Sequence, residues 1–324
     1  MPIRLKRKTG LGLGAAIAFG IGSMVGAGVF VLSGLVINTA GPSAILSYLF
    51  CGLLMVFSGL SYAALASIFP EDGGGYLYSK RMLGDRPGFL AGWGAYYAST
   101  ISNAFVLIGF GIYFGLLFSV AIDPRILALI ALIALTAINL RGVADAGRTE
   151  VTLVVVKLAI LILLIIVGVL SIQGTEFVPF APAGAVGLLQ GMVMVFFAYT
   201  GFQVASMMAG EIKQSSVKVP IAIIVSILVV IAIYIGVVVA LLSARLPTYG
   251  SQSVFDAAVV LMGSAGGALV AFAATVSTLS SSNASIVGAS RTILSMASER
   301  QLPGRFAKMR HGEPWNAIIL GSLI

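Results

Sequence analysis

Residues 150–172 read EVTLVVVKLAILILLIIVGVLSI, and the charged side chains in this stretch are Glu150 at its first position and Lys157. An α-helix needs about 20 predominantly apolar residues to cross the hydrocarbon core of a bilayer. The stretch meets that length and exceeds the usual length of an apolar run in a soluble core helix. It therefore predicts a transmembrane helix.

Similar apolar stretches recur along the whole chain. With 150–172 they predict eight spans, the others lying at about 12–35, 44–69, 89–120, 126–141, 186–209, 219–243 and 266–296. A ninth begins near Trp315 and is cut short at Ile324. We therefore expect an all-α integral membrane protein with eight full spans plus a stub.

The overall composition agrees with lipid as the main solvent. The chain is 59% hydrophobic and 9% charged, whereas a soluble domain carries about 25% charged residues. Its single cysteine, Cys51, and single histidine, His311, exclude a disulfide framework and a Cys/His zinc cluster. We expect no metal, no cofactor and no enzyme activity, because no catalytic triad or intramembrane carboxylate pair is visible.

The basic residues indicate the topology. Sixteen Lys and Arg fall in segments on the side of the N-terminus, whereas Arg125 and Arg245 fall on the other side. Positively charged loops face the cytoplasm, so we expect a cytoplasmic N-terminus in a multi-pass protein of the inner (plasma) membrane. Because the net charge of +8 is gathered in these short loops, it does not indicate nucleic-acid binding.

Two spans carry glycine-containing interruptions at mid-membrane. They are residues 22–28 (GSMVGAG) in the first span and 198–202 (AYTGF) in the sixth. Interruptions at corresponding positions of two halves indicate a transporter site. Five spans separate them, which predicts a five-plus-five inverted repeat with a first repeat at 1–172 and an incomplete second repeat at 173–324. The alternative for the first glycine run is a small-residue packing face.

Lys157 is the one basic residue left inside a span once the loops are assigned. It lies about 10 Å, or two turns, from the start of its helix, with no obvious carboxylate at its depth. One interpretation is that its ammonium extends to the headgroups. The other is a functional cation site in which the ammonium bonds to carbonyls and hydroxyls.

The eighth span is rich in polar side chains: Ser277, Thr278, Ser280, Ser281, Ser282, Asn283 and Ser285. Such a cluster either lines a polar cavity or bonds to the preceding turn of its own helix. The sequence leaves both alternatives open.

The chain resembles the amino acid–polyamine–organocation (APC) permeases. The matching segments occur in the family's order over the whole chain: 20–30 (GIGSMVGAGVF), 69–76 (FPEDGGGY), 196–202 (FFAYTGF), 210–213 (GEIK), Ser290-Arg291 and Leu302-Pro303. The resemblance implies a leucine-transporter-type fold, usually of twelve spans, and identifies this chain as one that ends in the ninth span.

The resemblance also implies a substrate site between the broken first and sixth spans. A substrate carboxylate would meet the N–H groups of Gly26, Ala27 and Gly28. Its ammonium would meet carbonyls in the two breaks, and the implied residues there are Ser23, Met24, Phe197, Thr200 and Gly201.

Coupling is implied for the fifth span. Phe197 matches an aromatic residue that covers the substrate in the family, and Lys157 matches a lysine that replaces the sodium ion of sodium-driven relatives. Ser281 or Ser282 would be the hydroxyl partners of this lysine.

The expected function is secondary active transport of amino acids, by proton coupling or exchange. Gln203 stands where many APC relatives have an acid, so neutral amino acids are favoured. The alternative is a non-transporting membrane subunit or a degenerate permease fragment. The expected partners are the amino acid, protons and the lipid bilayer, and the sequence assigns no oligomeric state.

Overall fold

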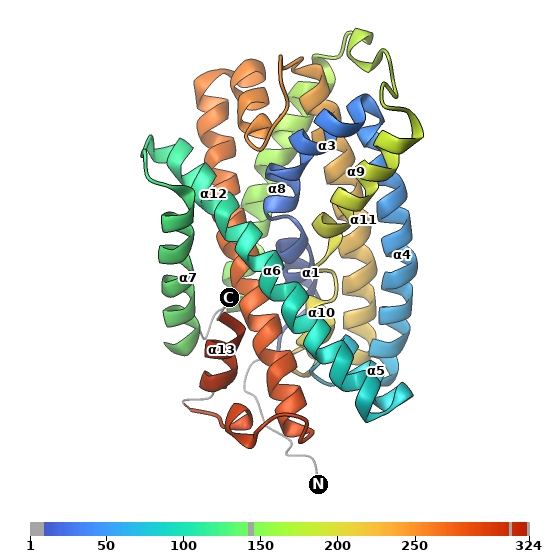
Figure 1. The fold of residues 1–324 in the computed structure, drawn as a ribbon, viewed down its shortest axis with the longest axis vertical. Helices are drawn as coiled ribbons and strands as arrows, with labels where there is room; N and C mark the ends of the chain where they lie inside the picture. Colours follow the sequence, from blue (N-terminus) through green and yellow to red (C-terminus); the bar gives the residue numbers. More distant parts are fainter. Residues whose placement is uncertain (1–9, 142–145, 311–312, 323–324) are drawn as a thin grey trace.

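Helices form almost all of the described chain (Figure 1). The structure is a computed structural model that describes residues 10–141, 146–310 and 313–322. The N-terminal basic residues, His311 and the end of the ninth apolar stretch lie outside these ranges. Eight helical stretches are long and apolar enough to cross a membrane. Within the described ranges there is no β-strand, only two isolated bridges, so the all-α prediction is confirmed.

The helices follow one another with short connections. In chain order they are α1 (Leu13–Met24), α2 (Ala27–Phe30), α3 (Leu32–Ala40), α4 (Ala44–Ile68), α5 (Gly75–Leu83), α6 (Asp85–Phe118), α7 (Pro124–Arg141), α8 (Ala146–Leu170), α9 (Gly184–Tyr199), α10 (Val204–Met207), α11 (Ser215–Ser243), α12 (Ser253–Ser298) and α13 (Trp315–Ser322).

Three segments differ from the sequence-based expectation. The first span continues through α3 to Ala40, and the loop after α4 contains α5 in addition to its glycine turn. Helix α12 begins at Ser253, ahead of the eighth span that we expected from 266. Gly263, with φ +74°, turns the chain inside α12, so the early residues form a separate helical segment before the span.

Helix α1 occupies the centre of the bundle, and α7 and α4 lie at opposite edges (Figure 1). It packs against α8, α11 and α12, while α6 runs along α12 and α4 along α11. Large apolar side chains point outward on α4, α7 and α9, among them Phe57, Ile133 and Val193 at 70%, 61% and 76% exposure. An apolar exterior around a packed interior is the arrangement that lipid requires.

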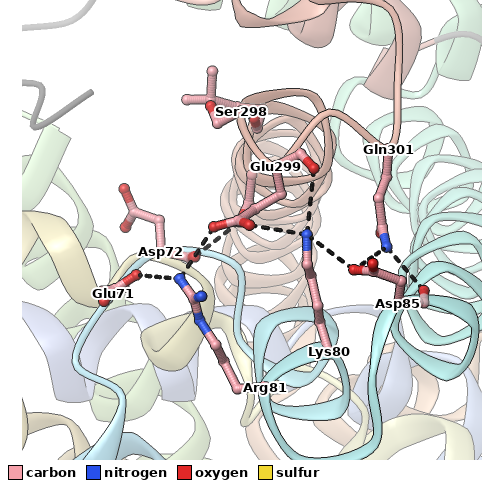
Figure 2. Close-up of polar contacts among 10 residues, drawn as sticks. Glu71, Asp72, Lys80, Arg81, Asp85, Ser298, Glu299 and Gln301 are labelled. Atoms are coloured by element: carbon pink, nitrogen blue, oxygen red, sulfur yellow. Dashed lines mark hydrogen bonds and ion pairs between the residues drawn. The ribbon is translucent and has the colours of Figure 1, made fainter. Parts of the chain in front are cut away.

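Ion pairs join α5 to the end of α12. We call this side of the molecule, where Lys80 and Arg81 of α5 meet Glu299, the basic side. Lys80 Nζ lies 2.9 Å from Glu299 Oε2 and 3.4 Å from Asp85 Oδ1, and Figure 2 marks both contacts with dashed lines. Arg81 Nη2 lies 3.1 Å from Glu299 Oε1 and 3.5 Å from Glu71 Oε2. The pairs with exposed partners contribute little stability individually, but together they fix α5 against α12.

Arg291 makes a second, buried connection on this side. Its Nε lies 2.9 Å from Glu211 Oε1 and its Nη2 lies 3.1 Å from Glu313 Oε2, with only 7% of the side chain exposed. The guanidinium therefore links α12 to the segment after α10 and to the segment before α13. Removing one partner of a buried charge cluster leaves the others uncompensated.

We expect Arg291→Gln to destabilise the fold far more than Arg81→Gln. The first leaves two carboxylates without their shared cation and costs about 3–5 kcal/mol. The second removes two ion pairs of an arginine whose side chain is 38% exposed and costs about 1 kcal/mol or less. Thermal unfolding of both variants in detergent measures the difference, and equal melting temperatures would contradict this role of Arg291.

Candidate functional site

The first and sixth spans are both broken near mid-membrane, as the sequence predicts. Helix α1 ends at Met24 and α2 begins at Ala27, with Val25 and Gly26 outside helical geometry. Helix α9 ends at Tyr199 and α10 begins at Val204. Gly201 in the second break has φ +129°, a conformation that side chains other than glycine rarely adopt.

The carbonyls at the end of α1 all have hydrogen-bond donors. Four of the donors are side chains from the neighbouring helices α8, α11 and α12. The bonds are Lys157 Nζ to Gly22 O (3.1 Å) and to Val25 O (3.0 Å), Ser281 Oγ to Ser23 O (2.8 Å), Tyr234 Oη to Met24 O (2.7 Å), and Ser277 Oγ to Val25 O. These bonds replace those that a continuous helix would have made.

Lys157 is fully buried and its ammonium points into the break of α1. It therefore does not extend to the headgroups in this structure. A cation at the carboxyl end of α1 also meets the negative end of the helix dipole. Ser281 and Ser282 do not bond to it: Ser281 donates to Ser23 O. The α12 hydroxyl that shares an acceptor with Lys157 is that of Ser277, because both donate to the Val25 carbonyl.

Glu150 is a buried carboxylate that the sequence analysis did not place at this site. It is 3% exposed, and Ser280 Oγ donates to its Oε1 at 2.6 Å. A Cβ added to Gly22 would clash with that Oε1. Gly22 therefore contacts the carboxylate through its Cα and the ammonium of Lys157 through its carbonyl. Spacing carried the missed signal, because positions seven apart lie on one helix face.

Tyr234 of α11 connects the two breaks. Its hydroxyl lies 2.7 Å from Met24 O and 2.9 Å from Ala198 O, and its single proton is shared between these carbonyls. The two chains approach closely beside it: a Cβ at Gly28 would lie 2.9 Å from Ala198 Cα. The glycine here allows the contact between backbones.

The hydroxyls of α12 bond to their own helix only in part. Thr275 and Thr278 donate to carbonyls of their own preceding turn. Ser277, Ser280 and Ser281 instead bond to α1 or α8. On the neighbouring face, Asn283 Oδ1 accepts from Asn139 Nδ2 of α7 at 2.7 Å. The cluster thus serves mainly to join helices.

A cavity of about 290 Å³ lies beside the second break, between α6, α9, α10 and α12. Its size is at the lower end of the range for small-molecule sites. Of the predicted substrate residues, Ser23, Phe197, Thr200 and Gly201 line it, whereas Met24, Gly26, Ala27 and Gly28 do not. Polar lining residues that the sequence analysis did not single out as site residues are Ser99, Ser102 and Ser285. No ionisable side chain is present in this lining.

Comparison with known families gives the identity of the fold. Residues 15–324 match the amino acid permease family. The chain belongs to this family. The match covers both broken spans, Lys157 and the α12 hydroxyls, so the residues described above all lie within the matched range.

Individual relatives are transporters. An uncharacterised transporter of Mycobacterium tuberculosis is 30% identical over all of this chain and 74% of its own length. A mitochondrial cationic amino acid transporter of Arabidopsis thaliana is 27% identical over 65% of this chain and 39% of its own length. The branched-chain amino acid permease of Bacillus subtilis is 36% identical over 34% of this chain and 23% of its own length. The family and these names support amino acid transport by a multi-pass membrane protein rather than an enzyme.

We expect Gly28→Ala to destabilise the chain while Gly14→Ala has little effect. The new methyl at position 28 would lie 2.8 Å from Ala198 Cβ and 2.9 Å from its Cα, which forces the two breaks apart at a cost of about 1–3 kcal/mol. A Cβ at position 14 meets nothing within 4 Å. Thermal unfolding of both variants provides the comparison, and a neutral Gly28→Ala would argue against close contact between the breaks.

Proposed function

We propose that this chain takes part in secondary active transport of amino acids, by proton coupling or exchange, and favours neutral amino acids. The observation that carries the proposal is the uncharged cavity beside the second helix break. A cationic or acidic side chain would lose its hydration there without gaining a counter-charge. The relatives include a transporter of cationic amino acids and a permease of branched-chain amino acids. Between these two substrate classes, the uncharged lining favours neutral amino acids.

The two breaks supply complementary groups for an amino acid. The first N–H groups of a helix have no intrahelical acceptor, so Ala27 and Gly28 are the proposed donors to the substrate carboxylate, although neither lines the cavity in this conformation. The N–H of Gly26 already donates to Met24 O at 2.9 Å, which makes it a secondary contact. Carbonyls near Ser23, Met24, Phe197 and Thr200 would take the ammonium, Gly201 allows the second break, and Phe197 would cover the ligand.

Lys157 is the proposed coupling group. An ammonium bonded to two carbonyls of α1 occupies the position of a bound cation, and it differs from a metal ion in having a proton to release. Loss of that proton removes the charge that the Gly22 and Val25 carbonyls face. The conformation of the α1 break is thereby linked to protonation.

The topology completes the proposal. We place the basic side in the cytoplasm, because positive loops face inward, and the protein in the inner (plasma) membrane. The division into a first repeat at 1–172 and a second at 173–324 is part of the same proposal. It is supported by the matching breaks in α1 and α9, which begin the two halves.

We expect neutral amino acids to raise the melting temperature of the purified chain in a concentration-dependent way. A ligand at 100 times its Kd adds about 2.7 kcal/mol of stability by mass action. The measurement is a thermal shift against a panel of amino acids at two pH values. Lys157→Gln should abolish the pH dependence of the shift, whereas the exposed Lys308→Gln should retain it.

The outcomes separate transport from a non-transporting role. Stabilisation by one or more neutral amino acids supports the proposed site. A chain that stays folded and responds to no amino acid would instead favour a membrane subunit without a substrate site.

We expect Gln203→Glu to shift selectivity towards lysine and arginine. Gln203 lines the cavity, and its Oε1 accepts from Gly201 N at 3.1 Å. A carboxylate there can form a charge-assisted bond worth about 1.5–3 kcal/mol, which is roughly a tenfold to hundredfold gain in affinity. Gln214→Glu is the matched control, because Gln214 is exposed and not among the cavity-lining residues. Equal effects of the two substitutions would exclude Gln203 from the site.

A further inference from the structure

Glu150 is a buried carboxylate that the proposed transport cycle has not used. It stands at the start of the fifth span and is 3% exposed, whereas most of the chain's acids lie in loops. Seven residues separate it from Lys157, and seven residues make almost two full turns. The two ionisable groups therefore lie on the same face of α8, and both face α1.

Gly22 of α1 contacts both Glu150 and Lys157. Its Cα packs against Glu150 Oε1, and its carbonyl accepts from Lys157 Nζ at 3.1 Å. Among the described residues no direct ion pair within 4 Å joins Glu150 to Lys157. The hydroxyl of Ser280 donates to the carboxylate at 2.6 Å. A buried carboxylate needs a compensating charge as well as hydrogen bonds, and among the α8 side chains that the structure describes Lys157 is the cation on the face of Glu150.

The other ionisable groups on the packed helices are engaged elsewhere or lie at helix ends. Helix α1 carries none. Helix α12 carries Asp256 near its start and Arg291, which is bound by Glu211 and Glu313. Helix α11 carries Lys218 near its start and Tyr234, whose hydroxyl lies between Met24 O and Ala198 O. Lys157 and Glu150 therefore form the ionisable pair at the α1–α8 contact.

We propose that Glu150 is the counter-charge and proton acceptor of Lys157. The inference rests on the proposed proton-coupled function. When the α1 carbonyls withdraw, an N–H bond of the ammonium breaks, its electron pair stays on nitrogen, and an O–H bond forms on the Glu150 carboxylate. The pair is ammonium and carboxylate before the transfer, and amine and carboxylic acid after it.

This pairing has two consequences for the movement of α1. The site has zero net charge in both forms, so α1 can separate from α8 without leaving an isolated charge in the membrane. Glu150 also lies about 10 Å closer than Lys157 to the start of α8. It can pass the proton to water on the basic side and return to the carboxylate form, which gives the released proton a direction.

A double-mutant cycle tests the pairing without any substrate. We expect Glu150→Gln and Lys157→Gln each to lower the melting temperature, because each leaves one buried charge uncompensated. The double variant should melt closer to the wild type than the sum of the single losses predicts. Glu71→Gln combined with Lys157→Gln is the control and should be additive. Additive losses for Glu150 and Lys157 would overturn the proposal.

Infrared spectroscopy distinguishes a proton acceptor from a structural partner. The difference between the spectra of the wild type and Glu150→Gln should contain a protonated-carboxyl band that appears on acidifying the purified chain. Its titration midpoint should move by about one pH unit or more in Lys157→Gln, because a nearby charge acts on the carboxyl. A Glu150 band that never titrates, or a midpoint unmoved by Lys157→Gln, would overturn the proposal.

Uptake connects the pair to transport. The probe is the amino acid that gives the largest thermal shift, with proteoliposomes assayed over a range of external pH. Glu150→Gln should flatten the pH profile and Glu150→Asp should restore part of it, whereas an unchanged profile in Glu150→Gln overturns the transport role. If no amino acid binds the wild type, the proposed function fails, and the infrared titration still decides whether Glu150 and Lys157 share a proton.

Discussion

A helix that stops inside a membrane leaves carbonyl groups without amide partners, and the surrounding lipid has no hydrogen to donate. Helix α1 stops at Met24, and the carbonyls of its last turn depend on side chains from other spans. Lys157, Ser281 and Tyr234 provide donors from α8, α12 and α11. The three helices pack around α1 so that each brings at least one donor to the break, and α12 brings two.

The same donors give the break its capacity to change. A backbone amide in a continuous helix cannot give up its bond without unfolding a turn, whereas a side-chain donor can move or lose a proton. Lys157 bonds two carbonyls at once, and we propose that its protonation state affects the stability of the break. Glu150, packed against Gly22, places the opposite charge at the same turn. Structure and the proposed coupling therefore depend on one set of contacts.

Lys157 could be identified from the sequence because a charge in an apolar run is exceptional at any depth. Glu150 could not, because a carboxylate at the first position of a span looks the same whether it faces water or the interior. Ser277 and Tyr234 were hidden for a related reason: serine is abundant in α12, and a tyrosine in a span is usually a packing residue. The resemblance implied Ser281 and Ser282 as partners of the lysine, but the hydroxyl that shares its acceptor is Ser277, one helical turn before Ser281.

The sequence by itself determined the membrane class, the eight spans, the two breaks and the candidate cation. These properties are local, since the length of an apolar run, the position of a glycine within it and the presence of a single charge can each be seen in one continuous stretch of sequence. Only the tertiary structure decided which donors complete the break, that Gly28 meets Ala198, and that Glu150 faces Gly22. Those contacts join residues more than a hundred positions apart, and the rotation of each helix about its axis selects them. That rotation is set by packing against neighbouring helices, and the sequence of a single span does not specify which helices those are.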